Sequence, residues 1–306
     1  MTAATGQSAV EWLLSSKEAA IRYLTRRDVL GEDDAEERAR ISDGAIVRAL
    51  LRNQRGNPYK KWQGAHWRLV ALADLELPAG EPRALAAAEQ VLDWLTGVGH
   101  RRSVRVVNGL TRRCASQEGN ALAACARLGL RDDPRVELLA RSLVEWQWPD
   151  GGWNCDDRAT RRSSFHESLA PTWGLHEYGA DWSRAAARQA AELFLEHRLF
   201  RRLATGEPLH PSVVELHYPP YWHYDVLQAL VVIWRLGLIR DARCADALDL
   251  LESKRRQDGR WSAARPWWRR PGSSGSNVEV VDWGRAEANE MVTLNALRVL
   301  TAAGRT

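Results

Sequence analysis

The sequence has few cysteines, little phenylalanine and no long apolar run. Its four cysteines, among 306 residues, are too few and too scattered for a disulfide framework. The longest apolar stretch, residues 226–238, is interrupted by Gln228 and Arg235 and falls short of the ~20 residues that a membrane span needs. The N-terminus lacks a basic segment followed by an apolar core, so no signal peptide is expected. These absences predict a cytoplasmic protein without a membrane span.

Positive and negative charges nearly balance, whereas tryptophan is in excess. A net charge of +4 is mild, so a nucleic-acid partner is not required, although the charge does not exclude one. The chain has 15 Trp but only 3 Phe. Such usage indicates that Trp has a repeated architectural role, a ligand-stacking role, or both.

Amphipathic helical segments alternate along the chain with more apolar ones. The apolar segments begin near residues 64, 118, 165, 220 and 287. A repeat of about 50 residues, each a helix pair, is typical of an array in which every unit buries its face on its neighbours. No strand alternation of usable length appears. The pattern predicts an all-α domain over residues 44–306, preceded by N-terminal helices and a charged connector over residues 1–43.

Three turns between these helices share one sequence pattern. Each has a Gln, then Gly, then a Trp, and each follows an Arg-bearing amphipathic helix. They are Gln54-Arg55-Gly56 with Trp62, Gln147 to Gly152 with Trp153, and Gln257-Asp258-Gly259 with Trp261. Gly and Pro break a helix, and the Gln amide and Trp indole are suited to lock the turn.

The apolar segments are expected to form an inner ring of helices. They are apolar over most of their circumference, which is typical of buried helices, but they begin with polar residues. Those residues are His66, Glu118, Asn120, His166, Glu167, His223, Asp225, Asn289 and Glu290. In a closed ring these N-termini meet at one rim, where the helix dipoles favour an anionic group. The Trp-rich loop 262–286 is a candidate lid over that rim.

The turns and the helix-pair array resemble a known superfamily. Gln147 to Trp153 and Gln257 to Trp261 look like the QW repeats of squalene and oxidosqualene cyclases. The array is similar to the α/α toroid that these cyclases share with protein prenyltransferase β subunits. The resemblance implies about six helix pairs in inner and outer rings, around a cavity for a hydrophobic, isoprenoid or terpenoid substrate. The chain has no Asp-x-Asp-Asp motif like that of the cyclases, and its length supplies one such domain where they have two.

The resemblance also implies a zinc site. Tyr221-Trp222-His223-Tyr224 looks like the His segment of the prenyltransferases, which makes His223 a candidate ligand; the Asp-x-Cys segment of that family is not reproduced. Cys155 and His166 complete the predicted metal set, because thiolate and imidazole suit Zn²⁺. The alternative is that Cys155 is a packed residue and both histidines are hydrogen-bonding groups at helix N-termini.

Polar and aromatic residues of the apolar helical segments supply candidates for catalysis and for substrate contact. The catalytic candidates are His223, Asp225, Glu167 and Glu118, and the substrate-binding candidates are Trp67, Trp173, Trp222, Tyr224, Asn289 and Glu290. Each has a structural alternative. Asp225 can cap a helix, a Glu in a first turn is favoured by the helix dipole, and a Trp can pack rather than bind.

The resulting hypothesis is an enzyme with a cyclase-like or prenyl-transfer-like activity on a hydrophobic isoprenoid substrate, assisted by zinc. One alternative is a carbohydrate-active α/α barrel, which also combines paired carboxylates with stacking Trp. Another is a non-catalytic helical-repeat protein that binds nucleic acid through a basic face.

Overall fold

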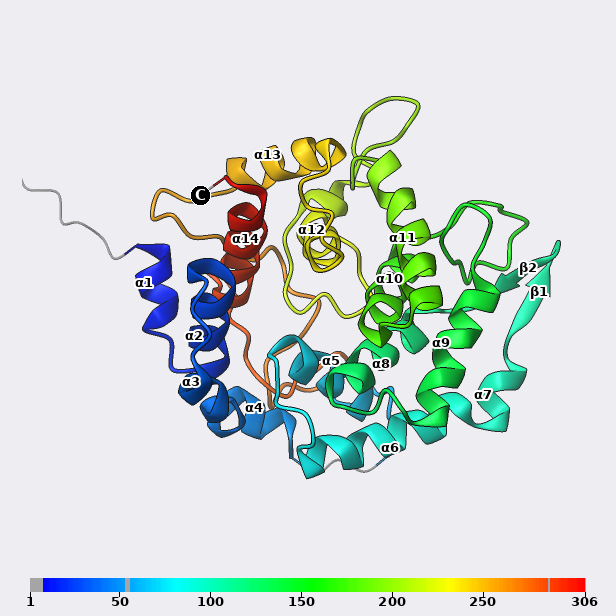
Figure 1. Ribbon diagram of the computed structural model, residues 1–306, viewed down its shortest axis with the longest axis horizontal. Coiled ribbons are helices and arrows are strands. Elements are labelled where there is room, and N and C mark those ends of the chain that lie inside the picture. The colour runs from blue at the N-terminus through cyan, green and yellow to red at the C-terminus, as the bar shows by residue number, and fades with distance from the viewer. Residues whose placement is uncertain (1–7, 53–55, 286, 306) are drawn as a thin grey trace, which may run out of the picture.

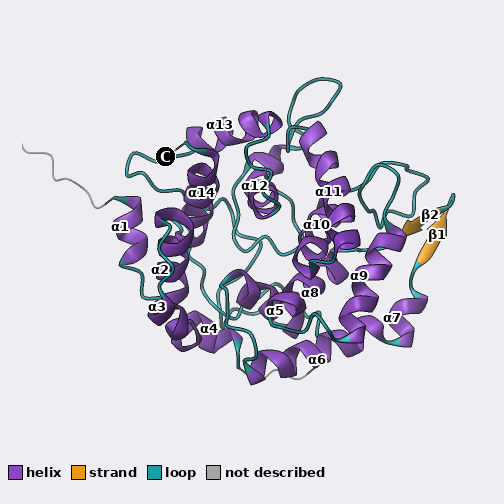
Figure 2. Ribbon diagram, in the orientation of Figure 1, coloured by secondary structure: helices purple, strands orange, loops and turns teal. Residues whose placement is uncertain are grey.

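A computed structural model describes residues 8–52, 56–285 and 287–305. Most of these residues lie in helices joined by loops, and one short hairpin is the sheet of the described part (Figure 2). The mostly helical character predicted from the sequence is therefore confirmed. No helix within the described ranges is both long enough and apolar enough to cross a bilayer.

The first helices of the N-terminal third are short, and α5 and α6 are longer. Its helices are α1 (Ala9–Leu14), α2 (Ala19–Thr25), a π turn (Arg26–Leu30), α3 (Ala35–Ala39), a 3-10 turn (Arg40–Asp43), α4 (Ala45–Leu50), α5 (Ala65–Asp74), α6 (Pro82–Thr96) and α7 (Val98–Arg102). The rest of the chain contains α8 (Ser116–Arg127), α9 (Pro134–Trp146), α10 (Phe165–Tyr178), α11 (Asp181–Glu196), a 3-10 turn (Pro211–Val214), α12 (Val226–Arg235), a 3-10 turn (Ala242–Cys244), α13 (Ala245–Ser253) and α14 (Glu290–Ala303).

Successive helices alternate between an inner and an outer position. In Figure 1, α5, α8, α10, α12 and α14 lie around the middle of the molecule, and α6, α9, α11 and α13 lie outside them. Burial follows the same division. α8 and α12 are buried over most of their circumference, whereas α9 buries a single stripe at Val136, Leu139, Ala140 and Leu143. Apolar residues spaced three and four apart give the outer helices one buried face.

The inner helices α8 and α10 approach each other most closely at glycine. A Cβ atom placed on Gly119 would lie 2.2 Å from the backbone nitrogen of Pro171, and one on Gly174 would lie 2.4 Å from the Gly119 carbonyl oxygen. The two backbones can therefore touch only because both positions lack a side chain.

Two of the three predicted turns have the same structure. The Trp153 indole N–H donates to the carbonyl of Leu143 on α9 at 2.9 Å, and its backbone N–H donates to the Ser168 hydroxyl on α10. Trp261 makes the matching pair of bonds, to a carbonyl ten residues upstream on α13 and to a threonine hydroxyl on α14. Each Trp thus fastens an outer helix to the inner helix that follows it.

The first predicted turn does not follow this pattern. Gln54 and Arg55 lie outside the described residues. Trp62 donates instead to the carbonyl of Trp267, far along the chain, and its ring stacks on Tyr221 at 3.6 Å between centroids. Trp62 therefore joins two loops rather than two consecutive helices.

The expectation that the chain has no strands is wrong for one segment. β1 (Arg105–Val107) pairs antiparallel with β2 (Leu110–Arg112). Asn108 and Gly109 between them both have positive φ, at 52° and 74°. This is the backbone that a two-residue hairpin turn needs, and Asn-Gly is the residue pair most suited to it.

The N-terminal helices pack beside the last helix of the chain. α1 and α2 both contact α14, and the Arg298 guanidinium of α14 is paired with Asp28 at 2.7 Å, with both side chains buried. The N-terminal helices α1, α2 and α3 therefore lie between α14 and α4 (Figure 1). The predicted division at residues 43 and 44 stays a prediction.

Candidate functional site

A cavity lies among the inner helices. It is lined by side chains of α5, α8, α10 and α12, by residues 218–223 and by Glu279, most of them apolar. It opens to solvent, and the atom-free space counted together with that open solvent is about 780 Å³, most of which is not enclosed by the protein. We call it the central cavity.

All three predicted substrate-binding tryptophans lie in the lining of the central cavity. They are Trp67 on α5, Trp173 on α10 and Trp222 in the loop before α12. The Trp173 ring lies under the Arg235 guanidinium, 4.6 Å from the ring centroid, and its indole N–H donates to Glu177. The aromatic rings are therefore held in place by contacts that do not involve a ligand.

His223 is held at the cavity by stacking. Its ring lies between Trp222, at 3.9 Å between centroids, and Trp267, at 4.1 Å. Its Nδ1 donates to the Pro220 carbonyl at 3.1 Å. Burial lowers the pKa of His223 to about 4, so the ring is neutral near pH 7. Trp267 belongs to the loop predicted as a lid, and this contact places part of that loop against the site.

His166 lies at the same end of the cavity as His223, with 6.4 Å between ring centroids. Its Nδ1 accepts a hydrogen bond from the backbone N–H of Tyr224 at 2.9 Å. A backbone N–H can only donate, so the proton of the neutral His166 ring is on Nε2. Burial lowers the pKa of His166 as well.

A buried ion pair lies at the other end of the cavity, where α5 and α12 finish. Asp74, the last residue of α5, contacts Arg235, the last residue of α12, at 2.5 Å and accepts a hydrogen bond from the Tyr218 hydroxyl. Burial by itself would raise the pKa of Asp74, but the guanidinium groups of Arg235 and Arg298 outweigh it and lower the pKa. The opposite charges of Asp74 and Arg235 therefore neutralise each other at this end of the cavity.

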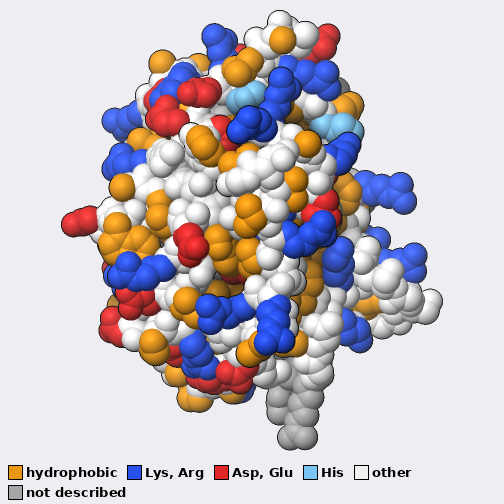
Figure 3. Space-filling model, turned by 90° about the vertical axis from the view of Figure 1, so that its right-hand side faces the viewer, with side chains coloured by type: hydrophobic (Ala, Val, Ile, Leu, Met, Phe, Trp, Pro, Cys, Tyr) orange, Lys and Arg blue, Asp and Glu red, His pale blue; other side chains and the backbone are white. Residues whose placement is uncertain are grey.

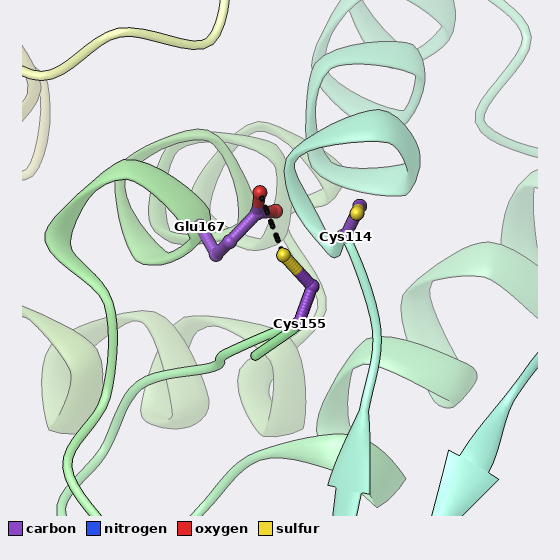
Figure 4. A group of neighbouring side chains, drawn as sticks. All are labelled: Cys114, Cys155 and Glu167. Atoms are coloured by element: carbon purple, nitrogen blue, oxygen red, sulfur yellow. Dashed lines mark hydrogen bonds between the residues drawn. The ribbon is translucent and has the colours of Figure 1, made fainter. Parts of the chain in front are cut away.

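A second group of reactive side chains lies where α8 and α10 begin. Cys114, Cys155 and Glu167 point toward one another from three separate segments (Figure 4). A parallel bridge between Arg112 and Asn154 aligns the two loops, so that Cys114 and Cys155 are side by side. Glu167 comes from the first turn of α10. We call this the Cys–Cys–Glu cluster.

Hydrogen bonds connect the members of the cluster. The Cys155 thiol donates to Glu167 Oε1 at 3.6 Å, and Glu167 Oε2 accepts from the backbone N–H of Ser116 at 3.0 Å. Burial raises the pKa of Glu167. The close approach of the two thiols lowers the pKa of Cys114 and, together with burial, raises that of Cys155.

The donor set of the cluster suits a metal ion. The two Sγ atoms and a Glu167 oxygen all lie within 4.8 Å of one another. Ligands of a tetrahedral zinc, at bond lengths near 2.0–2.3 Å, are separated by roughly 3.3–3.8 Å. The cluster is the one group of three or more potential ligands found in the described part of the chain.

The predicted metal set of Cys155, His166 and His223 is not brought together. Cys155 is paired with Cys114 and Glu167 instead. His166 uses Nδ1 to accept the Tyr224 N–H, and metal binding through its Nε2 would place a proton on Nδ1, facing that donor. The Cys155 prediction therefore fits the observed cluster, whereas the His166 prediction conflicts with its hydrogen bond.

Two predicted catalytic carboxylates are engaged in structural contacts. Glu118 is nearly fully buried and pairs with the Arg113 guanidinium at 2.7 Å and with His100 at 2.9 Å. Asp225 caps α12 by accepting from the Gln228 backbone N–H. It also accepts from His217, so the structural alternative for Asp225 describes its position better than a pairing with His223.

Three predicted substrate-binding residues also lie away from the lining of the central cavity. The Tyr224 hydroxyl donates to the carbonyl of Leu199 in a fully buried setting. Asn289 caps α14 and donates to the Trp283 carbonyl. Glu290 lies in the first turn of α14, where burial raises its pKa. These polar groups are used to fasten the ends of inner helices.

Comparisons with protein-family models, with curated proteins and with solved structures found no match to this chain. The function is therefore inferred from the geometry of the site together with the sequence resemblance given above.

Proposed function

We propose that the chain is a single α/α toroid that binds a hydrophobic, isoprenoid-type molecule in the central cavity and acts on it. The activity would be of the cyclase-like or prenyl-transfer-like kind. The observation that carries the proposal is a mostly apolar cavity, walled by Trp67, Trp173 and Trp222, with two neutral imidazoles at one end. Apolar walls with a few placed polar groups are typical of small-molecule sites.

Two features of the fold support the same assignment. The helices alternate between inner and outer positions, as a toroid of helix pairs requires (Figure 1). The Trp153 and Trp261 turns fasten consecutive helices through the same pair of hydrogen bonds, as repeated units should.

The alternatives receive less support. A glycosidase needs two free carboxyl groups beside the sugar. The carboxylates in the cavity lining are Asp74, which is paired with Arg235, and Glu279, which accepts from the Tyr221 hydroxyl. On the face shown in Figure 3, Lys and Arg side chains lie between acidic and hydrophobic ones rather than in one continuous basic stripe, which does not favour nucleic-acid binding.

The test of the proposal is equilibrium dialysis with tritiated farnesol. We expect about one bound molecule per chain. Ala71 lines the cavity, so Ala71→Phe should fill it and weaken binding at least about tenfold. Ala86→Phe, on the exposed side of α6, is the matched control and should bind as wild type does. Absence of binding, or equal binding by wild type and Ala71→Phe, would refute the proposal.

Zinc is the second component of the proposal, and Cys114, Cys155 and Glu167 would hold it. Three protein ligands leave a fourth position open, which is the arrangement of catalytic rather than structural zinc sites, and a zinc there would activate a thiol or a water molecule. Glu167 adjoins His166 in sequence, so the cluster lies next to the wall of the central cavity.

Elemental analysis of protein purified without a metal-affinity tag tests this component. We expect about one zinc per chain in wild type and in His223→Phe, and loss of zinc in Cys114→Ser, because a thiolate ligand is removed. Cys125→Ser is the control, since Cys125 is buried in α8 and outside the cluster. Zinc retained by Cys114→Ser, or lost by His223→Phe, would show that the ligands are assigned wrongly.

A further inference from the structure

The two imidazoles of the central cavity present opposite hydrogen-bonding groups. His166 Nδ1 accepts from the Tyr224 backbone N–H, so its proton is on Nε2. His223 Nδ1 donates to the Pro220 carbonyl, so its Nε2 carries a lone pair. A backbone N–H only donates and a carbonyl only accepts, and each tautomer is therefore fixed by its partner.

Both Nε2 atoms are available to a ligand. Within the described residues, no hydrogen bond of normal geometry uses Nε2 of His166 or of His223, and both rings line the cavity. The Trp222 backbone carbonyl also lies close enough to the His166 ring to raise its pKa, against the larger lowering by burial. The ring centroids are 6.4 Å apart and the ring planes are nearly perpendicular, at 85°. One oxygen atom between them, about 2.8 Å from each nitrogen, is compatible with that separation.

We infer that the central cavity recognises an apolar chain ending in a neutral hydroxyl group, that is, an isoprenoid or fatty alcohol. The alcohol oxygen accepts from His166 Nε2–H, and the alcohol proton is donated to His223 Nε2. This inference rests on the proposed function, because it needs a hydrophobic chain in the cavity, and it goes further by naming the polar end of that chain.

Other end groups fit the pair less well. A hydrocarbon leaves both nitrogens unpaired, and an ether can accept from His166 but has no proton for His223. A carboxylate likewise has no proton to donate, and its charge would face the lone pair of His223. The Lys61 ammonium lies 5.3 Å from the Trp222 ring centroid, so an acid must be included in the test.

The experiment compares four ligands with the same chain: farnesol, farnesyl methyl ether, farnesene and farnesoic acid. Dissociation constants are measured by equilibrium dialysis at neutral pH. We expect wild type to bind farnesol best, the ether about three- to tenfold more weakly because one hydrogen bond is lost, and farnesene more weakly than the ether. The acid should also bind more weakly than farnesol.

The His223→Phe variant removes the hydrogen bond between the alcohol and His223 and leaves the one with His166. Phe keeps a flat ring between Trp222 and Trp267, so the stack is retained. The variant should bind the ether as wild type does but lose the preference for farnesol over the ether. If the variant does not fold, the wild-type series decides the inference alone.

The outcomes distinguish the inference from the proposed function. If wild type binds farnesol, its ether and farnesene equally, or binds the acid as tightly as farnesol, the hydroxyl assignment is overturned while the hydrophobic site stands. A preference for farnesol that persists in His223→Phe also overturns it. If none of the four binds, both the inference and the proposed function fail.

Discussion

The close approach of α8 and α10 gives the sharpest prediction about the fold. Replacing Gly119 by Ala would place a Cβ atom 2.2 Å from Pro171 N and 2.4 Å from the Ala170 carbonyl carbon. Ordinary contact begins at 3.4 Å, so the two backbones would have to separate by roughly an ångström. Neither clashing atom belongs to a flexible side chain, so the strain cannot be relieved by a change of rotamer.

Two opposing effects set the change in the free energy of unfolding of Gly119→Ala. Gly→Ala in a helix gains about 1 kcal/mol in intrinsic propensity. Overpacking a close-packed interface typically costs about 1–3 kcal/mol, and backbone-to-backbone contact is the severe case. We therefore expect a net loss of about 1–2 kcal/mol in the free energy of unfolding. The shift would also disturb the Ser116–Glu167 hydrogen bond, which joins the same two helices.

The assay is urea unfolding followed by far-UV circular dichroism. Gly99→Ala is the matched control, because Gly99 also lies in a helix but a Cβ there meets nothing within 4 Å. The control should be neutral or stabilising by up to about 1 kcal/mol. If Gly119→Ala proves as stable as Gly99→Ala, the packing of α8 on α10 described above is wrong.

Two further predictions concern stability. His66 is fully buried, and burial lowers its pKa from 6.5 to about 3, so the unfolded chain binds one more proton between these values and stability falls as the pH drops below 6.5. Between pH 7 and pH 5 wild type should lose about 2 kcal/mol more than His66→Phe in urea unfolding; equal losses would refute this. Trp261→Phe removes the indole N–H that the Leu251 carbonyl accepts and should cost about 1–3 kcal/mol, whereas Trp182→Phe, on a partly exposed ring, should cost less than about 0.5. Similar costs for the two Trp variants would show that the turn is not locked in this way.

The helices were predictable because their periodicity is strong, but their ends depended on local chemistry. Residues 135–147 have a clear helical periodicity, and α9 spans Pro134–Trp146. The apolar segment that begins near residue 220 becomes helical only at Val226, where α12 begins. Asp225 caps it there by accepting from the Gln228 N–H, and Tyr221 has a positive φ that a helix does not allow. The segment 221–225 is therefore a turn that carries His223.

The hairpin was missed although its signal is in the sequence. Asn108-Gly109 is the residue pair that favours a two-residue turn, and it is flanked by Val107 and Leu110. Each strand has only three residues, too short for an alternating pattern to stand out among long helices.

The cavity tryptophans and the Cys–Cys–Glu cluster differ in how far sequence could reveal them. Trp67 and Trp173 lie on inner helices, so helical periodicity places them near the cavity. Cys114 and Cys155 meet because a bridge between Arg112 and Asn154 aligns two loops, and no local pattern encodes that pairing. The predicted zinc set followed the histidines instead, and the hydrogen bond from Tyr224 to His166 is a tertiary contact that sequence spacing could not supply.

The most direct test of the central claim is to map where a hydrophobic ligand touches the protein. A farnesol analogue that carries a diazirine on its chain is photolysed with the protein, and the labelled peptides are identified by mass spectrometry. The account predicts labels within residues 165–178 and 218–235, which line the central cavity, and loss of those labels when excess farnesol is present. Labels confined to outer helices such as α6 and α9, or labelling that farnesol does not suppress, would contradict it.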